Sequence, residues 1–509
     1  MVRATYVVEC DWNNDGTYTG TGENLTARTI KLEWSRGRDY ASQLTGKSVA
    51  TRLTAILDNE SGDYNSFNTS SPLSGSLLPG RSVRIRTTAP TSVTLWQGKL
   101  DSIIPELGLR SLQQARLEAV GPLGFLSSRE VRIPMQSNTL SGVIINTILN
   151  QAGWASADRS VDAGIITVKR YEAEDIAAIE ALREIEESEI GFLSESKDNK
   201  VVFEDRDHRL KSDHLTSQAT FTDATTGTLG YQEIVQEDPL PNIFNIFEAK
   251  LQTFTVGTLA VLWTHPEANT SGTAPLVEQG SGSAVFYAFY PSPAKELTDI
   301  GVDAWTTPLA TSDYQGFSDT AGTGTDLTTA LSLSVSKFAR AMKLTFTNTG
   351  TKNSYITKLQ ARGTPVTKDN PVVIEAIDGS STAIYGERKW PVPAEWLADG
   401  TAALNYVRYL KGIYPDPIPI LSMTVFANRD NAHLTQALVR NISDRVTVVA
   451  TSTRTNLGIN QAFYIENEHH VVTQHRVHMV TWGLSSFEGY SKYWVLDTSK
   501  LGQDTALSF

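Results

Sequence analysis

The sequence has a single cysteine, no long apolar run and no early leader-like segment. Cys10 alone cannot form an internal disulfide or a cysteine-based zinc site. No uninterrupted apolar stretch approaches the roughly 20 residues that a helix needs to cross a bilayer, so no membrane-spanning segment is expected. The opening residues, MVRATYVVECDWNNDG, turn polar too early for a signal peptide.

Basic charge is also scarce. The 509 residues include 44 Lys and Arg against 56 Asp and Glu, so the formal net charge is −12. A general nucleic-acid binder needs an excess of basic residues to displace counterions from phosphates, which excludes that class. Hydrophobic residues make up 40% and charged residues 20%, a balance that excludes a largely disordered chain. At the usual domain size, the length predicts three or four domains.

Established catalytic motifs are missing as well. The chain has no G-x-S-x-G elbow, H-E-x-x-H pair, P-loop or dinucleotide-binding fingerprint. The acidic run Glu184, Glu186, Glu187 and Glu189 lies on a predicted helix, and we interpret it as a solvent-exposed face. Two carboxylates distant in sequence can still meet, so a glycosidase pair stays open. The prediction is nonetheless that the protein is not an enzyme.

What the chain has in abundance is threonine, with 57 residues, beside 36 Gly and 20 Pro. Threonine suits a half-buried pleated surface, whereas Gly and Pro mark turns. The predicted fold class is therefore mainly β with a smaller α/β part. Helices are expected only near 140–153, 172–187, 399–414 and 431–442, where apolar residues recur with helical spacing.

The pattern divides the chain into four parts. Residues 1–125 read as short strands separated by turns, which predicts an antiparallel β-barrel. Residues 126–230 combine helices with a hairpin and predict an α/β domain. Residues 251–365 are rich in Thr, Ser, Gly and aromatics and predict an inserted β-sandwich. Residues 366–509, with help from 231–250, predict a second β-barrel.

The two ends of the chain share a weak internal repeat. Near the front, LTAILDN (53–59) precedes PGRSVRI (79–85); near the back, MTVFANR (423–429) precedes SDRVTV (443–448). Each second block opens with a turn and an arginine, then continues as an alternating strand followed by two more strands. The shared order of elements, rather than identity, favours two related barrels in one chain.

Several segments resemble a known family. LTGKSVATRLTAILDNESGDYN (44–65), SPLSGSLLPGRSVRIRTT (71–88), LWQGKLDSIIP (95–105) and ALREIEESEIGFLSESKDNKVVFEDRDHRL (181–210) are similar to baseplate-hub or minor tail proteins of long-tailed bacteriophages. So is the C-terminal pattern SDRVTVVA, FYIENEHHVV, HMVTWGLS and YWVLDTSKLG. The resemblance covers roughly residues 1–250 and 370–502, about three quarters of the chain, and leaves 251–365 as an insertion.

The resemblance implies a structural virion protein of the phage tail tip, assembled in the host cytoplasm. Hub proteins of this kind carry two tail-tube-like β-barrels per subunit and form homotrimers, so a threefold hub docks beneath a sixfold tube. The implied partners are tail-tube and distal tail proteins and tail fibre or tip proteins. DNA would pass through without being specifically bound, and the acidic composition suits that role.

One loop has calcium-like spacing. Asp11, Asn13 and Asp15 place oxygen atoms at alternate positions, and Gly16 occupies the sixth, where a calcium loop turns sharply. The twelfth position is Gly22 instead of a glutamate, however, and no helices are predicted around the loop. The candidate metal site is therefore these three residues with Ca²⁺, and a tight polar turn is the alternative. No other cofactor is predicted.

Four of the eight histidines lie close together: His469, His470, His475 and His478. In a hairpin, two or three of them, with Glu466 or Glu468, would be able to hold a metal. Their spacing matches no established site, so we interpret them as solvated strand and loop residues.

The aromatic residues of the insertion raise a second hypothesis. Trp263, Tyr287, Tyr290 and Trp305 are candidate ligand-binding residues, because exposed aromatic rings stack on sugars. Aromatics on both faces of one strand more often indicate core packing. The alternative function is thus a carbohydrate- or receptor-binding tail adhesion protein, and a cell-wall-degrading tail enzyme is the third.

Overall fold

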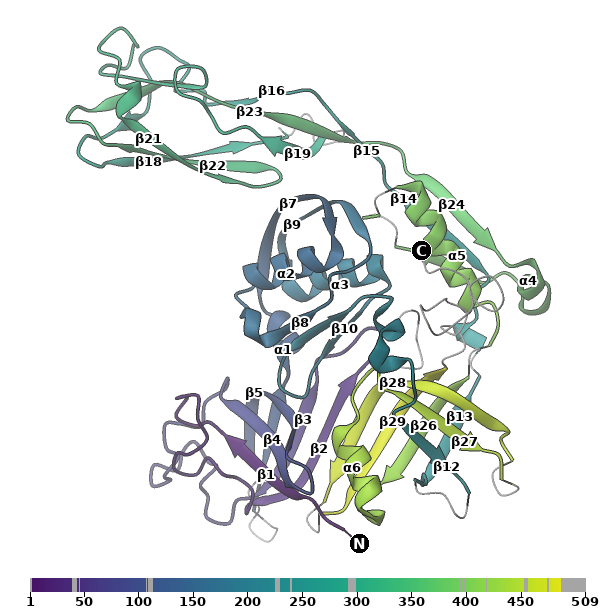
Figure 1. Cartoon of the computed structure of the whole chain (residues 1–509). Helices are drawn as coiled ribbons and strands as arrows, with labels where there is room; N and C mark the ends of the chain where they lie inside the picture. The colour runs from purple at the N-terminus through teal and green to yellow at the C-terminus, as the bar shows by residue number, and fades with distance from the viewer. Residues whose placement is uncertain are drawn as a thin grey trace.

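The computed structural model describes residues 2–38, 44, 46–106, 108, 113–224, 229–238, 240–291, 299–393, 396–397, 399–417, 419–452, 456–473 and 476–486. The fold is mainly β, as predicted. Figure 1 shows a large sheet at the base, an α/β unit above it, and a β-rich arm that projects to one side at the top. No helix in the described ranges is long and apolar enough to cross a membrane.

The base is one twelve-stranded sheet. Its N-terminal strands are β1 (Thr5–Cys10), β2 (Thr29–Gly37), β3 (Arg52–Asp58), β4 (Ser82–Ala89), β5 (Val93–Glu106) and β6 (Gln114–Val120). The others are β12 (Ala219–Thr222), β13 (Glu233–Glu237), β26 (Ile420–Phe426), β27 (Arg445–Ala450), β28 (Ile459–Val472) and β29 (His478–Ser486).

The strand order of this sheet repeats. The first half runs β1-β4-β5-β6-β3-β2, and the second runs β12-β27-β28-β29-β26-β13. Each strand therefore has a counterpart, although β1 pairs with β4 antiparallel and β12 pairs with β27 parallel. The internal repeat predicted from the sequence is confirmed in strand order.

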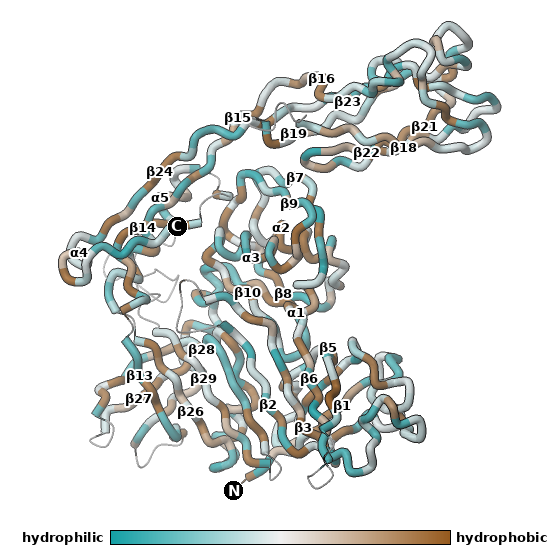
Figure 2. Tube along the Cα trace, turned by 180° about the vertical axis from the view of Figure 1, so that it is seen from behind, coloured by the Kyte–Doolittle hydropathy of each residue, from teal (hydrophilic) through white to brown (hydrophobic). Residues whose placement is uncertain are grey.

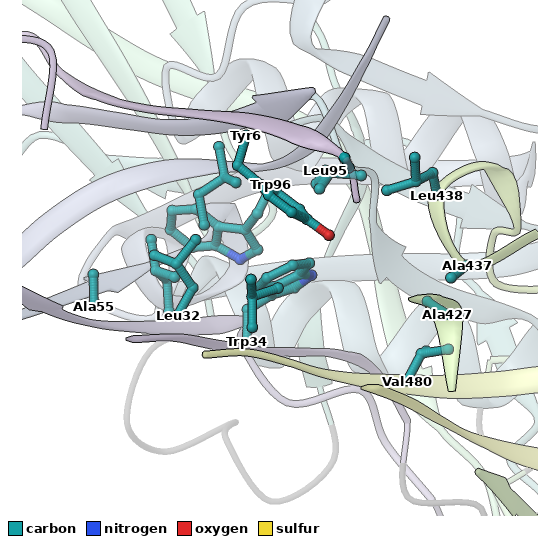
Figure 3. Close-up of a cluster of buried hydrophobic side chains, with 14 of the residues drawn as sticks. Tyr6, Leu32, Trp34, Ala55, Leu95, Trp96, Ala427, Ala437, Leu438 and Val480 are labelled. Carbon is teal, nitrogen blue, oxygen red and sulfur yellow. The ribbon is translucent and has the colours of Figure 1, made fainter. Parts of the chain in front are cut away.

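The two halves are joined where β2 pairs antiparallel with β28. Apolar residues of both halves form one core, in which Tyr6 and Trp34 from the first half lie near Ala427 and Val480 from the second (Figure 3). None of the sheets closes into a barrel among the described strands, so the two closed barrels are not confirmed. The halves are open, and they share one core instead of enclosing two.

The α/β unit has its own core. It contains the helices α1 (Pro122–Leu126), α2 (Ser141–Gln151) and α3 (Ala178–Glu189), and the strands β7 (Glu130–Leu140), β8 (Arg159–Val161), β9 (Thr167–Ala177), β10 (Phe192–Glu195) and β11 (Val201–Glu204). The helix predicted from 172 begins only at Ala178, because residues up to Ala177 pair with β7 in the long strand β9.

A small layer lies between the base and the arm (Figure 1). It consists of β14 (Ile246–Leu251), β24 (Val372–Ile377), β25 (Lys389–Val392), α4 (Gly379–Tyr385) and α5 (Gly400–Ile413). Asp399 caps α5 by accepting hydrogen bonds from two backbone amides, and Asp430 caps α6 (Asn431–Val439) by accepting one from the His433 amide. Of the segment 366–509, β26–β29 thus belong to the base, whereas β24, β25 and α5 build this layer.

The arm contains two packed sheets with a separate apolar core between them. One sheet is built around the long strand β23 (Ser354–Lys368), which pairs with β15 (Phe254–Val256), β16 (Ala260–Thr264), β17 (Leu276–Val277), β19 (Asp299–Trp305) and β20 (Tyr314–Phe317). The other has the order β18 (Ser283–Phe289), β22 (Ala341–Asn348), β21 (Leu331–Lys337). Figure 2 shows both sheets extending away from the rest of the chain.

Candidate functional site: the buried seam between the sheet halves

The seam where β2 meets β28 is lined by charged and aromatic side chains. Successive side chains of a strand alternate between faces, so Glu466, Glu468 and His470 share one face of β28. The register places Trp34 opposite His470 and Arg36 opposite Glu468. A slip of one residue would move all of these groups to the other face, so the seam fixes the register of the two halves.

The central ion pair of the seam is fully buried. Arg36 Nε donates to Glu468 Oε1 at 2.9 Å, and the two side chains are 3% and 0% exposed. Arg36 Nη1 also donates to the backbone oxygen of Glu195 in β10, at 3.1 Å. One guanidinium therefore links the first half, the second half and the α/β unit.

A second buried carboxylate lies beside the first. Glu466 accepts hydrogen bonds from Arg38 Nε at 2.8 Å and from Arg209 Nη1 and Nη2 at 2.6 and 2.9 Å. The arginines around them hold the pKa values of Glu466 and Glu468 far below the ordinary range, although burial acts in the opposite direction. Both carboxylates are thus kept charged inside the fold.

A hydrogen-bonded chain continues from the ion pair into the first half. His470 Nδ1 lies 2.8 Å from His478 Nε2, and His478 Nδ1 lies 2.8 Å from the Tyr6 hydroxyl. Trp34 stacks on His470 with ring centroids 4.6 Å apart. Burial lowers the pKa of both histidines and raises that of Tyr6, so the three side chains of this hydrogen-bonded series are uncharged.

Lys197, at the turn between β10 and β11, closes the cluster from the side of the α/β unit. Its Nζ donates to the backbone oxygens of Leu438 and Arg440, at 2.9 and 2.6 Å. Burial lowers the pKa of Lys197 to about 8. These contacts join the α/β unit to the second half, so the cluster acts as a structural junction of three parts.

A cavity of about 380 Å³ adjoins this junction, between the α/β unit and α5. Arg38 and Arg209 line it, but both already bind Glu466. Burial raises the pKa of Glu186, also on its wall, to about 7, and the Oε1 of this residue accepts from the Leu193 amide at 2.7 Å. The polar groups of the wall therefore serve the packing of the fold.

Two interpretations from the sequence are wrong. His470 and His478 are buried instead of solvated, because β28 and β29 form the middle of the sheet; His469 is partly exposed, and His475 lies outside the described residues. The acidic run is not a solvent-exposed face either. Glu186 and Glu189 are buried. Glu189 accepts hydrogen bonds from the Ser141 hydroxyl and from the backbone amides of Ile165 and Ile166.

The proposed calcium residues lie together in the turn after β1. Asp11 is buried, and its carboxylate accepts from the backbone amides of Asp15 and Gly16, at 3.1 and 3.0 Å. Asn13 Oδ1 accepts from the Asp15 amide, at 3.0 Å. Groups of three or more His, Cys, Asp or Glu suited to a metal are not found in the part of the chain that is described.

The four candidate aromatics of the arm do not converge. Tyr290 and Trp305 are buried in the arm core, and Trp263 packs at its margin. Tyr287 alone is exposed, beside Phe289, which the sequence analysis did not select. Strict alternation along 285–289 was the signal that would have identified Phe289.

No protein-family model and no curated protein matches the chain. Solved structures do match it over most of its length. A tail protein from Neisseria meningitidis has a TM-score of 0.49 at 10% identity, covering 95% of this chain and 97% of that one. The 43 kDa tail protein of prophage MuSo2 from Shewanella oneidensis has a TM-score of 0.48 at 10% identity, covering 95% of this chain and 99% of that one. Prophage tail protein gp18 from Listeria monocytogenes has a TM-score of 0.42 at 9% identity, covering 94% of each chain. All three are tail proteins, two of them from prophages.

Replacement of Arg36 by methionine is expected to destabilise the protein by about 3–5 kcal/mol, because it leaves Glu468 charged and buried without its partner. The measurement is the free energy of unfolding in urea. The double variant Arg36→Met with Glu468→Met removes both charges and should recover much of that loss. A single variant that unfolds like the parent protein would show that the pair does not hold the seam.

The buried histidines predict loss of stability on acidification. Their pKa values are lowered in the folded state, so below about pH 6.5 the unfolded chain binds protons that the folded chain does not, and stability falls. The expected loss between pH 7.5 and 5.5 is on the order of 1 kcal/mol per histidine. In the variant His470→Gln with His478→Gln, the urea midpoint should depend less on pH; an unchanged dependence would contradict the assignment.

The Asp11 turn predicts no response to calcium removal, since the carboxylate of Asp11 already accepts backbone amides. We expect the melting temperature to be the same with a chelator and with added CaCl₂. A rise with CaCl₂ that Asp15→Ala abolishes would establish the calcium site instead.

Proposed function

We propose that the chain is a structural component of a phage tail, a hub subunit that assembles as a homotrimer, closes the end of the tail tube and anchors the distal host-recognition parts. The observation that carries the proposal is the duplicated sheet. One subunit contains two copies of the same six-strand arrangement, already joined side by side.

The repeat extends to individual hydrogen bonds. The Gly80 amide donates to the Leu100 oxygen at 2.7 Å, and the Ser443 amide donates to the Ile465 oxygen at 2.8 Å. Gly80 and Ser443 both have a positive φ, of 83° and 66°. Leu100 and Ile465 also precede a bulge at the same place in β5 and β28. Leu100 therefore corresponds to Ile465, and this pair anchors the alignment of the two halves through their strand pairings.

Each half has an edge that matches the joined edge of the other. β2 pairs with the later part of β28, and their counterparts are β13 and the later part of β5. Among the described strands, β13 pairs only with β26, and β4 covers β5 only as far as Lys99. The segment Asp101–Glu106 thus presents an edge on which β13 of another copy would repeat the seam, except at Pro105, which has no backbone N–H to donate.

A contact of this kind is head-to-tail, and such contacts generate a ring when the rotation closes. Three copies would present six sheet halves, which suits docking beneath a sixfold tube. The acidic composition supports passage of DNA without binding, because negative surfaces repel phosphates. Tail-tube proteins, distal tail proteins and tail fibre or tip proteins are the proposed partners, in the virion.

The other two hypotheses concern different parts of the chain. Adhesion to a carbohydrate or receptor would use the arm, which projects from the body (Figure 1). An enzyme would need free paired carboxylates, whereas Glu186 and Glu189 of the acidic run each accept backbone amides. A non-enzymatic role agrees with this use of the two acids.

The proposed ring predicts a specific disulfide between copies. By the alignment, Glu237 of β13 and Ile104 of β5 correspond to Ser35 and His469 of the seam. The Arg38 amide donates to the Glu466 oxygen, so by alternation Ser35 and His469 form a non-hydrogen-bonded pair. Such pairs have Cα atoms about 4.5 Å apart, within reach of a disulfide. Glu237→Cys with Ile104→Cys should therefore give covalent dimers and trimers on oxidation.

The chain supplies matched controls. Ser35→Cys with His469→Cys should cross-link within one subunit, and the single variants should give no trimers. Val235→Cys with Ile104→Cys is displaced by two residues and should react poorly. Cys10 is buried and gives little background. The parent protein should have the mass of three copies by light scattering; a monomer that forms no covalent trimer would overturn the proposal.

A further inference from the structure

The outer face of the arm sheet β18-β22-β21 is open to solvent. Met342, Leu344 and Phe346 of the central strand point inward and are fully buried in the arm core. Their neighbours in the strand point outward, and the residues paired with those neighbours in β18 and β21 lie on the same face. Three columns of side chains thus form a platform. Figures 1 and 2 show how the arm that carries this sheet projects from the rest of the chain.

The first column is apolar and aromatic. Val285, Tyr287 and Phe289 are 45%, 50% and 61% exposed, and the rings of Tyr287 and Phe289 lie nearly parallel with centroids 6.2 Å apart. An edge strand that exposes two neighbouring aromatic rings is a recognisable interaction surface. Aromatic faces carry partial negative charge and attract the polarised C–H groups on the apolar side of a pyranose ring.

The other two columns are hydroxyl-rich. The register places side chains of β22 and β21 beside the aromatic column: Lys343, Thr345 and Thr347, then Ser332, Ser334 and Ser336. Serine is depleted in protein–protein interfaces, whereas the hydroxyls of a sugar need partners of this kind. The composition therefore favours a polysaccharide over a protein partner.

Charge indicates which kind of polysaccharide. The three strands contain no Asp or Glu, so Lys343 is a cation at the centre of an acid-free face. No ion pair of Lys343 occurs in the part of the chain that the structure describes. Residues 251–365 include seven Lys and Arg against eight Asp and Glu, so the arm carries little of the net charge of −12. An anionic polymer would be repelled by the rest of the chain but not here.

We propose that this platform binds a negatively charged polysaccharide, with Tyr287 and Phe289 stacking on sugar rings and Lys343 pairing with its acidic groups. The inference names the ligand class and the residues of the adhesion role, and it does not depend on ring formation. The serine and threonine columns orient the sugar hydroxyls.

The test measures binding of the full chain to three soluble polymers: alginate, which has charged sugars, dextran, which has neutral sugars, and polyglutamate, which has charge without sugars. Alginate should bind best. Tyr287→Thr with Phe289→Thr keeps strand-forming residues and should weaken alginate binding at least about tenfold. Lys343→Gln should weaken it at low salt and reduce its dependence on salt.

The matched control is Leu259→Ala with Val261→Ala, which removes an exposed apolar pair from another part of the arm and should leave binding unchanged. Melting temperature confirms that each variant is folded. Equal binding of polyglutamate and alginate, or a folded Tyr287→Thr/Phe289→Thr variant that binds like the parent, would overturn the proposal. A change of oligomer mass in that variant would assign the face to contacts between copies instead. Failure here leaves the disulfide test of the ring unaffected.

Discussion

The buried ion pair between Arg36 and Glu468 is the contact on which the arrangement of the chain depends. Both charges are removed from water, so each requires the other, and the pair forms only in one register of β2 against β28. The same arginine bonds to the backbone of β10. An apolar seam would tolerate sliding of the halves, whereas this one fixes the base and the α/β unit together.

The two halves of the duplicated sheet differ at their edges. The two halves share strand order and bulge position, but their edges carry different residues. Inside the subunit the edge strand β2 offers Trp34 and Arg36; at the outer edge, the corresponding residues are Gln236 of β13 and Asp238 just after it, and both are exposed. The inner contact forms when the subunit folds and stays closed, so it can bury an ion pair. In the proposed ring, the outer edge is exposed to water until the copies assemble. An edge of this kind favours polar residues.

The small layer and the arm add separate cores to this base. The arm has its own apolar interior, so the outer face of the sheet β18-β22-β21 is not needed for packing against the base. That independence allows Tyr287 and Phe289 to remain exposed on β18, whereas Trp34 of the seam is buried. The proposed structural and recognition roles thus fall on different sheets of one chain.

The sequence alone determined the β-rich class and the internal repeat, because strand alternation and turn residues are local signals. The helices predicted near 399–414 and 431–442 are likewise present, as α5 and α6. Only the tertiary structure decided which polar residues became buried. His470, His478, Glu186 and Glu189 look solvent-exposed by pattern, and they are buried because partners distant in sequence satisfy their hydrogen bonds. Such pairing depends on long-range register, which no local pattern encodes.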